Sequence, residues 1–163
     1  TQVFHEIARA YKLAGAMDIY EEIIRNRLIL HFKRSGLNLD SVKSSIVRLI
    51  KDSAFVPQII IVDGFSFDKA SESDLHFWKK LAQEHDAEIW FSATLPPELP
   101  ITDQTIIPAP INAFAETLTV VILLVAHRDY IELKLVKDNG ERQLDRLQLR
   151  LDPKTLLIAN RRI

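Results

Sequence analysis

Two strand-like segments of the chain are each followed by polar side chains that could act on a phosphorylated ligand. Asp63 comes directly after four aliphatic residues, at 59–62. Ser92 ends a second segment of this kind, at 87–92, and Thr94 follows it. A carboxylate at the end of a strand can hold Mg²⁺, directly or through water, and a neighbouring hydroxyl can contact a terminal phosphate or orient an attacking water. We therefore predict Asp63, Ser92 and Thr94 as catalytic residues and Asp63 as the metal ligand.

These side chains can act together only if a sheet brings them to one edge, and the sequence predicts such a sheet. The uninterrupted aliphatic run at 59–62 is typical of a strand buried on both faces. An amphipathic helix is expected over about 72–85, and a second strand over 87–92. A strand, a helix and a strand of these lengths form a βαβ unit with parallel strands. Because ligands bind at the carboxyl ends of parallel strands, the polar residues should share one pocket.

The N-terminal third has the periodicity of helices, and no strand is predicted there. Helices are expected over 3–13, over 18–34, and from Asp40 as N-cap to a point before Pro57. The apolar stripe of the second helix is expected to be buried; it consists of Ile19, Ile23, Ile24, Leu28 and Phe32.

The remainder of the chain is predicted to be rich in strands. They are expected at 105–107, 119–126, 131–136, 147–151 and 156–158, with a turn at 137–140. We predict a single domain over 1–163, with a helical segment at 1–56 and an α/β core at 57–163. The predicted fold is a three-layer α/β/α sandwich whose mostly parallel central sheet ends in antiparallel strands.

Composition limits the partners that are open to the chain. Its 163 residues are 47% hydrophobic and 26% charged, which is typical of one globular domain with a core. Lys and Arg number 21 against 22 Asp and Glu, so the net charge of −1 gives no general attraction for nucleic acid or an anionic membrane. A local basic patch stays open, formed by Arg25, Arg27, Lys33 and Arg34. No apolar run is long enough to span a membrane.

Some kinds of site are excluded by residue type. The absence of cysteine excludes disulfides, thiolate metal sites and a cysteine nucleophile, and it agrees with the cytoplasmic location that we predict. The five histidines share no spacing of metal ligands, which argues against zinc.

The two strand tips together resemble the Walker B and sensor strands of the P-loop NTPases, in particular the RecA-like and helicase-like branches. Ile59-Ile60-Ile61-Val62-Asp63 is similar to the four hydrophobic residues and aspartate of a Walker B motif. Ser92-Ala93-Thr94 is similar to the Ser-Ala-Thr motif of superfamily-2 helicases. The resemblance covers about residues 57–95, and it implies binding and hydrolysis of ATP with Mg²⁺ as cofactor.

Two further positions enter through this resemblance. The segment 133–140 is similar to the late hairpin of RecA-like ATPases, which implies that Lys134 or Lys137 contacts nucleotide, including nucleotide on a neighbouring subunit. Thr1 opens a helix as the last residue of a phosphate-binding loop does, and so it too is a predicted nucleotide-binding residue.

The sequence also departs from this family. It contains no G-x-x-x-x-G-K-[ST] motif, and Gly64 stands where the family commonly has a glutamate base. We therefore expect the chain alone to bind nucleotide weakly. Hydrolysis is expected only when residues upstream of Thr1 are included.

Other interpretations stay open. Asp63 could be a carboxylate that anchors the following loop at Gly64 and Ser66. The chain could then be a non-catalytic interaction or regulatory module, which binds a partner protein or a second copy of itself through the helical segment. Asp63 with Ser92 also resembles the acceptor site of response-regulator receiver domains. Receivers begin with a strand and carry a lysine before a later proline, and this chain has neither feature.

Overall fold

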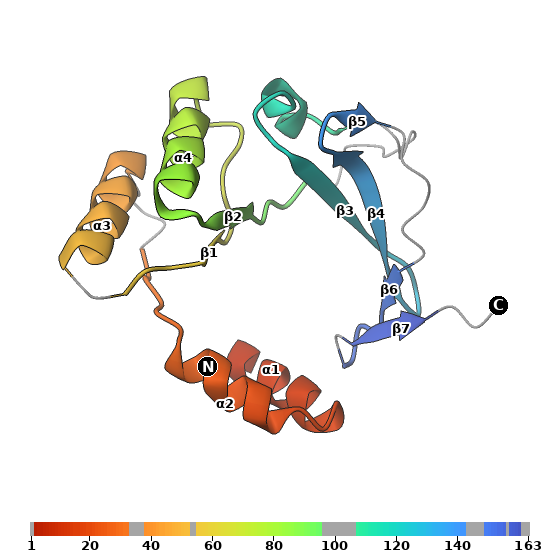
Figure 1. Cartoon of the computed structure of the whole chain (residues 1–163). Helices are drawn as coiled ribbons and strands as arrows, with labels where there is room; N and C mark the ends of the chain where they lie inside the picture. The colour runs from red at the N-terminus through yellow and green to blue at the C-terminus, as the bar shows by residue number, and fades with distance from the viewer. Residues whose placement is uncertain are drawn as a thin grey trace. The chain divides into compact units, whose positions relative to one another are not determined.

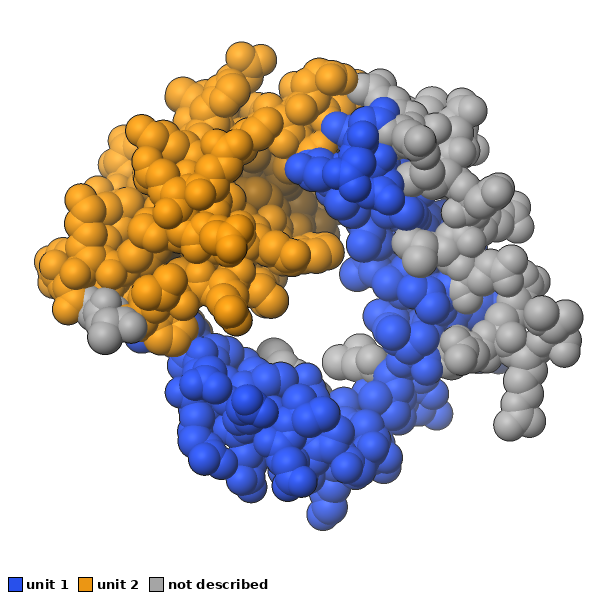
Figure 2. Space-filling model, viewed as in Figure 1, with its two compact units in different colours: residues 1–30, 104–106, 119–163 blue, residues 31–103, 107–118 orange. Residues whose placement is uncertain are grey.

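The computed structural model contains helices and strands in two compact units, shown in Figures 1 and 2. Unit 1 comprises residues 1–30, 104–106 and 119–163, and unit 2 comprises residues 31–103 and 107–118. The structure describes residues 2–32, 38–52, 55–95, 107–142, 149–155 and 157–160. The predicted mixture of helices and strands is confirmed, with one small parallel sheet and one antiparallel sheet.

Two helices begin unit 1, and the second is shorter than predicted. Helix α1 (Gln2–Leu13) ends in a turn at Gly15, whose φ of +66° is a conformation that glycine adopts without strain. Helix α2 (Met17–Arg25) ends at Asn26, so the expectation of a helix over 18–34 is wrong.

The apolar stripe of the helix predicted over 18–34 is not buried, contrary to prediction. All five of its side chains are exposed: Ile19, Ile23, Ile24, Leu28 and Phe32. Helices gain most of their stability by burying an apolar face. No residue of α2 is buried, so nothing offsets the cost of extending the helix past Asn26.

Unit 2 contains the predicted βαβ unit. Strand β1 (Ile59–Val62) pairs in parallel with β2 (Glu88–Phe91), and helix α4 (Glu72–His85) connects them. The register places Ile59 beside Glu88 and Val62 beside Phe91, so both strands end level with each other. The prediction of parallel strands with a helix between them is therefore confirmed.

Helix α3 (Leu39–Asp52) and α4 pack on the same face of this sheet. The cluster contains Val42 and Ile46 of α3, Trp78 and Leu81 of α4, and the strand residues Ile60, Val62, Ile89 and Phe91. On the other face, Ile59, Ile61 and Trp90 are exposed. The expectation that the first strand is buried on both faces is therefore wrong for the described structure, because both helices lie on one side.

The start of α4 is fixed to α3 by a charged contact. Ser71 caps α4, and its hydroxyl and backbone form a capping box with Asp74. Lys43 of α3 donates to the Asp74 carboxylate, and its ammonium lies 5.1 Å from the centre of the Phe77 ring. Burial alone would raise the pKa of Asp74, but the hydrogen bonds from Lys43 and Ser71 lower it to about 2.

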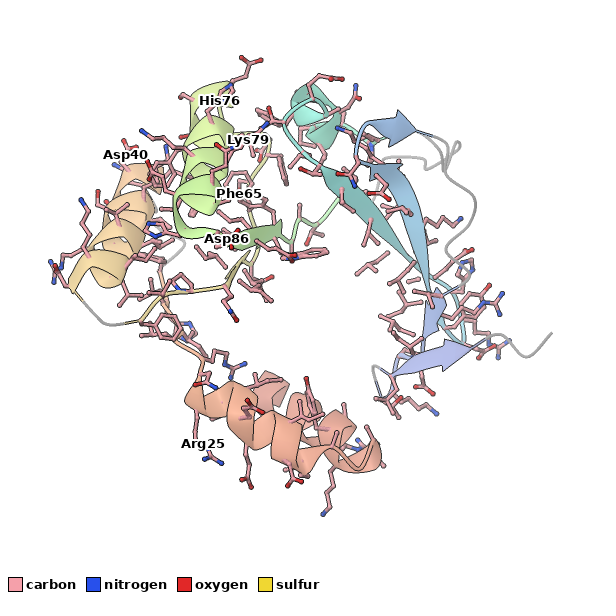
Figure 3. All side chains as sticks on the ribbon, viewed as in Figure 1. Arg25, Asp40, Phe65, His76, Lys79 and Asp86 are labelled. Atoms are coloured by element: carbon pink, nitrogen blue, oxygen red, sulfur yellow. The ribbon has the colours of Figure 1, made fainter. Side chains whose placement is uncertain are left out.

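The start of α3 and the end of α4 are both closed by capping residues next to the helix. Asn38 accepts the backbone N–H of Asp40 at 2.9 Å, so Asn38 caps α3, and the prediction of Asp40 as N-cap is wrong by two positions. Asp86, labelled in Figure 3, ends α4 with a φ of 49°, a left-handed conformation that often closes helices.

The remaining strands form a separate antiparallel sheet in unit 1. The short helix η1 (Ile111–Phe114) precedes it in the chain. The sheet consists of β3 (Val120–Ala126), β4 (Ile131–Asp138), β5 (Glu141–Arg142), β6 (Leu149–Leu151) and β7 (Ile158–Asn160). The strand order is β3-β4-β6-β7, and β5 pairs with β4. The predicted turn is confirmed, because Asn139 and Gly140 both have positive φ.

Two further expectations concern the strand at 105–107 and the absence of a membrane-spanning segment. Most of the strand expected at 105–107 lies outside the described residues. Among the helices that the structure describes, none has both the length and the apolar character needed to span a bilayer.

Candidate functional site

The side chains of Asp63 and Ser92 meet at the carboxyl ends of β1 and β2. The Ser92 hydroxyl donates to Asp63 Oδ1, and the backbone N–H of Gly64 donates to the Ser92 hydroxyl at 2.9 Å. Backbone hydrogen bonds continue the pairing beyond the strands, from Ser92 N–H to Val62 O at 3.0 Å and from Phe65 N–H to Ser92 O at 2.8 Å. The juxtaposition expected from the βαβ pattern is therefore present.

Gly64 turns the chain immediately after the carboxylate. Its φ is +70°, which side chains other than glycine rarely adopt. A Cβ built at this position would meet no atom within 4 Å, so the requirement for glycine is conformational rather than steric. The P-loop family commonly has a glutamate at this position, and a glutamate would be strained at the φ of Gly64.

An aromatic cluster holds the loop that follows Gly64. Phe65 and Phe67 are both buried and pack against Phe91 of β2 and Phe114 of η1. The ring centres of Phe65 and Phe91 are 4.7 Å apart, and those of Phe67 and Phe114 are 5.8 Å apart. Phe65 is labelled in Figure 3. Because this loop is anchored by buried rings, the backbone that carries Asp63 has a fixed exit from the sheet.

The polar tip is accessible to solvent. Asp63, Ser92 and Thr94 are all exposed. Asp63 uses Oδ1 for Ser92, and the hydrogen bonds found among the described residues leave its other oxygen available. The structure therefore brings Asp63 and Ser92 together. Thr94 lies two residues after Ser92 and takes no part in those hydrogen bonds.

The tip offers too few protein ligands to bind a metal ion alone. The described residues contain no group of three or more His, Cys, Asp or Glu side chains placed to hold a metal. Mg²⁺ differs from most ions in this respect, because it keeps several waters and is commonly held by one or two carboxylates together with substrate phosphates. A single exposed carboxylate such as Asp63 fits that form of binding.

The other predicted nucleotide-binding residues are Thr1, Lys134 and Lys137. Thr1 lies outside the described residues. Lys134 and Lys137 lie on β4, which belongs to unit 1, whereas Asp63 belongs to unit 2. Lys134 Nζ is 3.4 Å from Glu132 Oε2, and only 5% of Lys137 is exposed. A contact between Lys134 and a ligand would require it to leave this ion pair.

Sequence reasoning missed a cluster at the end of the β3–β4 hairpin. His127 Nε2 lies 3.0 Å from Glu132 Oε2, and the rings of His127 and Tyr130 stack at 4.4 Å. The Arg150 guanidinium lies 4.0 Å from the centre of the Tyr130 ring. Burial would raise the pKa of Glu132, but hydrogen bonds from His127 and Lys134 lower it. The alternation at 131–135 could have shown that Glu132 and Lys134 share a face; the pairing with Arg150 depends on the register of β6.

A shallow groove of about 380 Å³ lies between α3 and α4. It is lined by Lys43, Ser44, Val47, Arg48, Lys51, Asp52 and Phe77. Its charges are largely paired within the protein, because Lys43 contacts Asp74 and Arg48 lies 3.6 Å from Asp52. The groove therefore gives no strong preference for an anionic ligand, and its lining does not include Asp63 or Ser92.

No protein-family model, no curated protein and no solved structure matches the chain. The function is therefore inferred from the geometry of the strand tips.

Proposed function

We propose that the chain is a P-loop-like ATPase domain that binds Mg²⁺-ATP at the carboxyl ends of β1 and β2. The observation that supports this proposal best is the hydrogen bond from the Ser92 hydroxyl to Asp63. It joins an acid and a hydroxyl from the tips of neighbouring parallel strands, which is the position where such sheets bind ligands.

Each side chain has a specific role in this proposal. The free carboxylate oxygen of Asp63 accepts from a water ligand of Mg²⁺, and Ser92 holds the carboxylate in orientation through its hydrogen bond. Thr94, which is exposed, orients the attacking water or contacts the terminal phosphate. When bound, Mg²⁺ neutralises negative charge on the phosphates.

The proposed fold is a three-layer α/β/α sandwich. Parallel sheets are normally covered on both faces. The face of β1 and β2 that carries Ile59, Ile61 and Trp90 is exposed in unit 2, so it offers the apolar surface that a second helical layer requires.

The test is a binding measurement, because the sequence has no phosphate-loop motif and hydrolysis is not expected of this chain alone. Binding of ATP is measured by calorimetry with and without Mg²⁺ for the wild type, Asp63→Asn and Asp68→Asn. Asp68 is the matched control, since it is an exposed aspartate in the loop that follows Gly64 and the variant has the same change in charge.

We expect weak binding that strengthens with Mg²⁺ in the wild type and in Asp68→Asn. In Asp63→Asn the effect of Mg²⁺ should be lost, because the carboxylate that accepts from the hydrated ion is gone. Equal Mg²⁺ dependence in the two variants, or no ATP binding by the wild type, would refute the proposal. Circular dichroism of each variant verifies that it is folded.

A second function is favoured by a different observation. The exposed apolar side chains over 19–32 are typical of a surface that binds another protein, which supports a non-catalytic interaction module. Asp63 would then be a structural anchor. In that case Asp63→Ala would lower the free energy of unfolding by about 1–3 kcal/mol and change no response to nucleotide.

A further inference from the structure

Among the described strands, β3 forms an edge of the antiparallel sheet. It lies at one end of the order β3-β4-β6-β7, and its only strand partner within the described structure is β4. Its seven residues, Val120 to Ala126, include no charge, proline or glycine. Proteins normally block such edges with lysine, proline, a bulge or a short strand. Here one irregularity, between Val121 and Ile122, affects one end, and 122–126 remains regular.

One face of this sheet is apolar across β3, β4 and β6. The register aligns Ile122 with Leu135 and Leu124 with Leu133, and Leu133 in turn with Leu149 on β6. Nine apolar residues lie on this face: Ile122, Leu124, Ala126, Ile131, Leu133, Leu135, Leu149, Leu151 and Ile158. None of the nine is fully buried. The charged residues Glu132, Lys134 and Arg150 alternate with them and so lie on the opposite face.

We propose that β3 pairs antiparallel with β3 of a second copy of this chain, so that the two sheets join into one. A strand that pairs with itself about a two-fold axis offers the same donors and acceptors on both sides, and the edge is satisfied symmetrically. This inference concerns unit 1 and does not depend on the nucleotide site proposed above.

The composition of the strand favours this partner over a chain of different sequence. Every side chain that would be opposed across the new pairing is aliphatic, so no like charges meet and no charge is buried without a partner. Self-repulsion is small at a net charge of −1. The other free edges are less suitable, because β1 and β2 have four residues each and β7 has three.

The apolar face also selects the register of the new pair. In an antiparallel pairing, opposed residues point to the same face, and a shift by one residue exchanges the faces. The apolar surface continues across both sheets only if the two-fold axis passes beside a residue. With the axis at Leu123, Ile122 would lie opposite Leu124 of the second copy; with the axis at Leu124, the two Leu124 side chains would be opposed.

Sedimentation of the full chain over a range of concentrations tests the proposal, with two matched lysine variants. Leu124→Lys places a charge on the β3 edge, and Ile158→Lys places the same charge on the same face at β7. The two side chains are 59% and 60% exposed, so both variants should fold, which circular dichroism verifies.

We expect the wild type and Ile158→Lys to change from monomer to dimer as concentration rises. Leu124→Lys should require at least a tenfold higher concentration. A wild type that remains monomeric would overturn the proposal. So would equal disruption by both variants, because that result indicates stacking of sheet faces rather than pairing of edges.

Cross-linking provides a second measurement, because the chain has no cysteine of its own. Single cysteines are introduced at Ile122, Leu123, Leu124 and Ile158, and each protein is oxidised mildly. Identical residues approach within disulfide distance only beside the two-fold axis. A covalent dimer through position 123 or 124, with none through 158, supports the pairing. Cross-linking that is equal at all four positions would contradict it.

Discussion

The two sheets of this protein differ in how they use their faces. In unit 2, one face of the parallel pair β1–β2 packs on α3 and α4, and the strands deliver Asp63 and Ser92 to one end. In unit 1, the antiparallel sheet forms largely through hairpins, and its apolar face is only partly buried. The parallel pair is suited to position polar groups because both strands end together. In the antiparallel sheet, β3 instead ends the described strand order, and we propose that this edge pairs with a second copy.

The largest expected effect is the difference in the free energy of unfolding between substitutions on the two faces of the parallel sheet. Trp78 on α4 is 2% exposed, and its indole N–H has no hydrogen-bond partner within the described structure, so it stabilises the fold by packing. Trp78→Ala should lower the free energy of unfolding by about 3–5 kcal/mol. Trp90→Ala, on the face where this side chain is 47% exposed, should cost about 1 kcal/mol or less. Urea unfolding followed by circular dichroism measures both; equal losses would mean that the exposed face is covered in solution.

The same contrast should exist within the antiparallel sheet, with a smaller effect. Val136 is among the most completely buried side chains of the described residues, whereas Leu124 is exposed. Val136→Ala removes two buried methyl groups and should cost about 2 kcal/mol. Leu124→Ala should change the free energy of unfolding by less than about 0.5 kcal/mol in the monomer. The measurement is urea unfolding at low protein concentration, and a large loss in Leu124→Ala would show that this face is buried.

The contact between Asp74 and Lys43 should make the stability of unit 2 depend on pH. The pKa of Asp74 falls from 3.8 to about 2 on folding, so its contribution is complete above pH 4 and is lost as pH falls towards 2. This difference corresponds to about 2 kcal/mol at neutral pH. Asp74→Asn should be destabilised by that amount at pH 7 and by little at pH 2. A constant difference across this range would contradict the assignment.

A weaker effect is expected from Glu132 in unit 1. Its pKa is lowered by His127 and Lys134, so its contribution is present at neutral pH and is lost as pH falls below the usual range of a glutamate. Because His127 and Glu132 are partly exposed, Glu132→Gln should cost about 1 kcal/mol or less. Hydrogen exchange of the amides at 127–132 measures this local change, with Asp129→Asn as the control of equal charge change.

Local patterns in the sequence predicted several elements correctly. The helix over 72–85, the parallel strands on either side of it and the turn at Asn139 follow from residues that are close together in the chain. The meeting of Asp63 and Ser92 could also be predicted, because a βαβ unit brings consecutive parallel strands side by side. The roles of these two residues stay predictions.

The wrong predictions concern elements whose length or exposure depends on which surface buries them. The periodicity of 18–34 is helical, but the helix ends at Arg25, since no described surface covers its apolar stripe. The aliphatic run at 59–62 gave no indication that Ile59 and Ile61 would be exposed. An apolar residue shows that burial is favourable, but it does not identify the surface that provides it.

The sequence by itself determined the turn at Asn139, the extent of α4 and which strands can be parallel. These properties depend on backbone conformation and on hydrogen bonds between residues a few positions apart, such as Ser71 and Asp74. Only the tertiary structure decided that Lys43 contacts Asp74, that Arg150 lies over Tyr130 and that β3 forms an edge. Such contacts join residues far apart in the chain, so they exist only once packing has selected which surfaces meet.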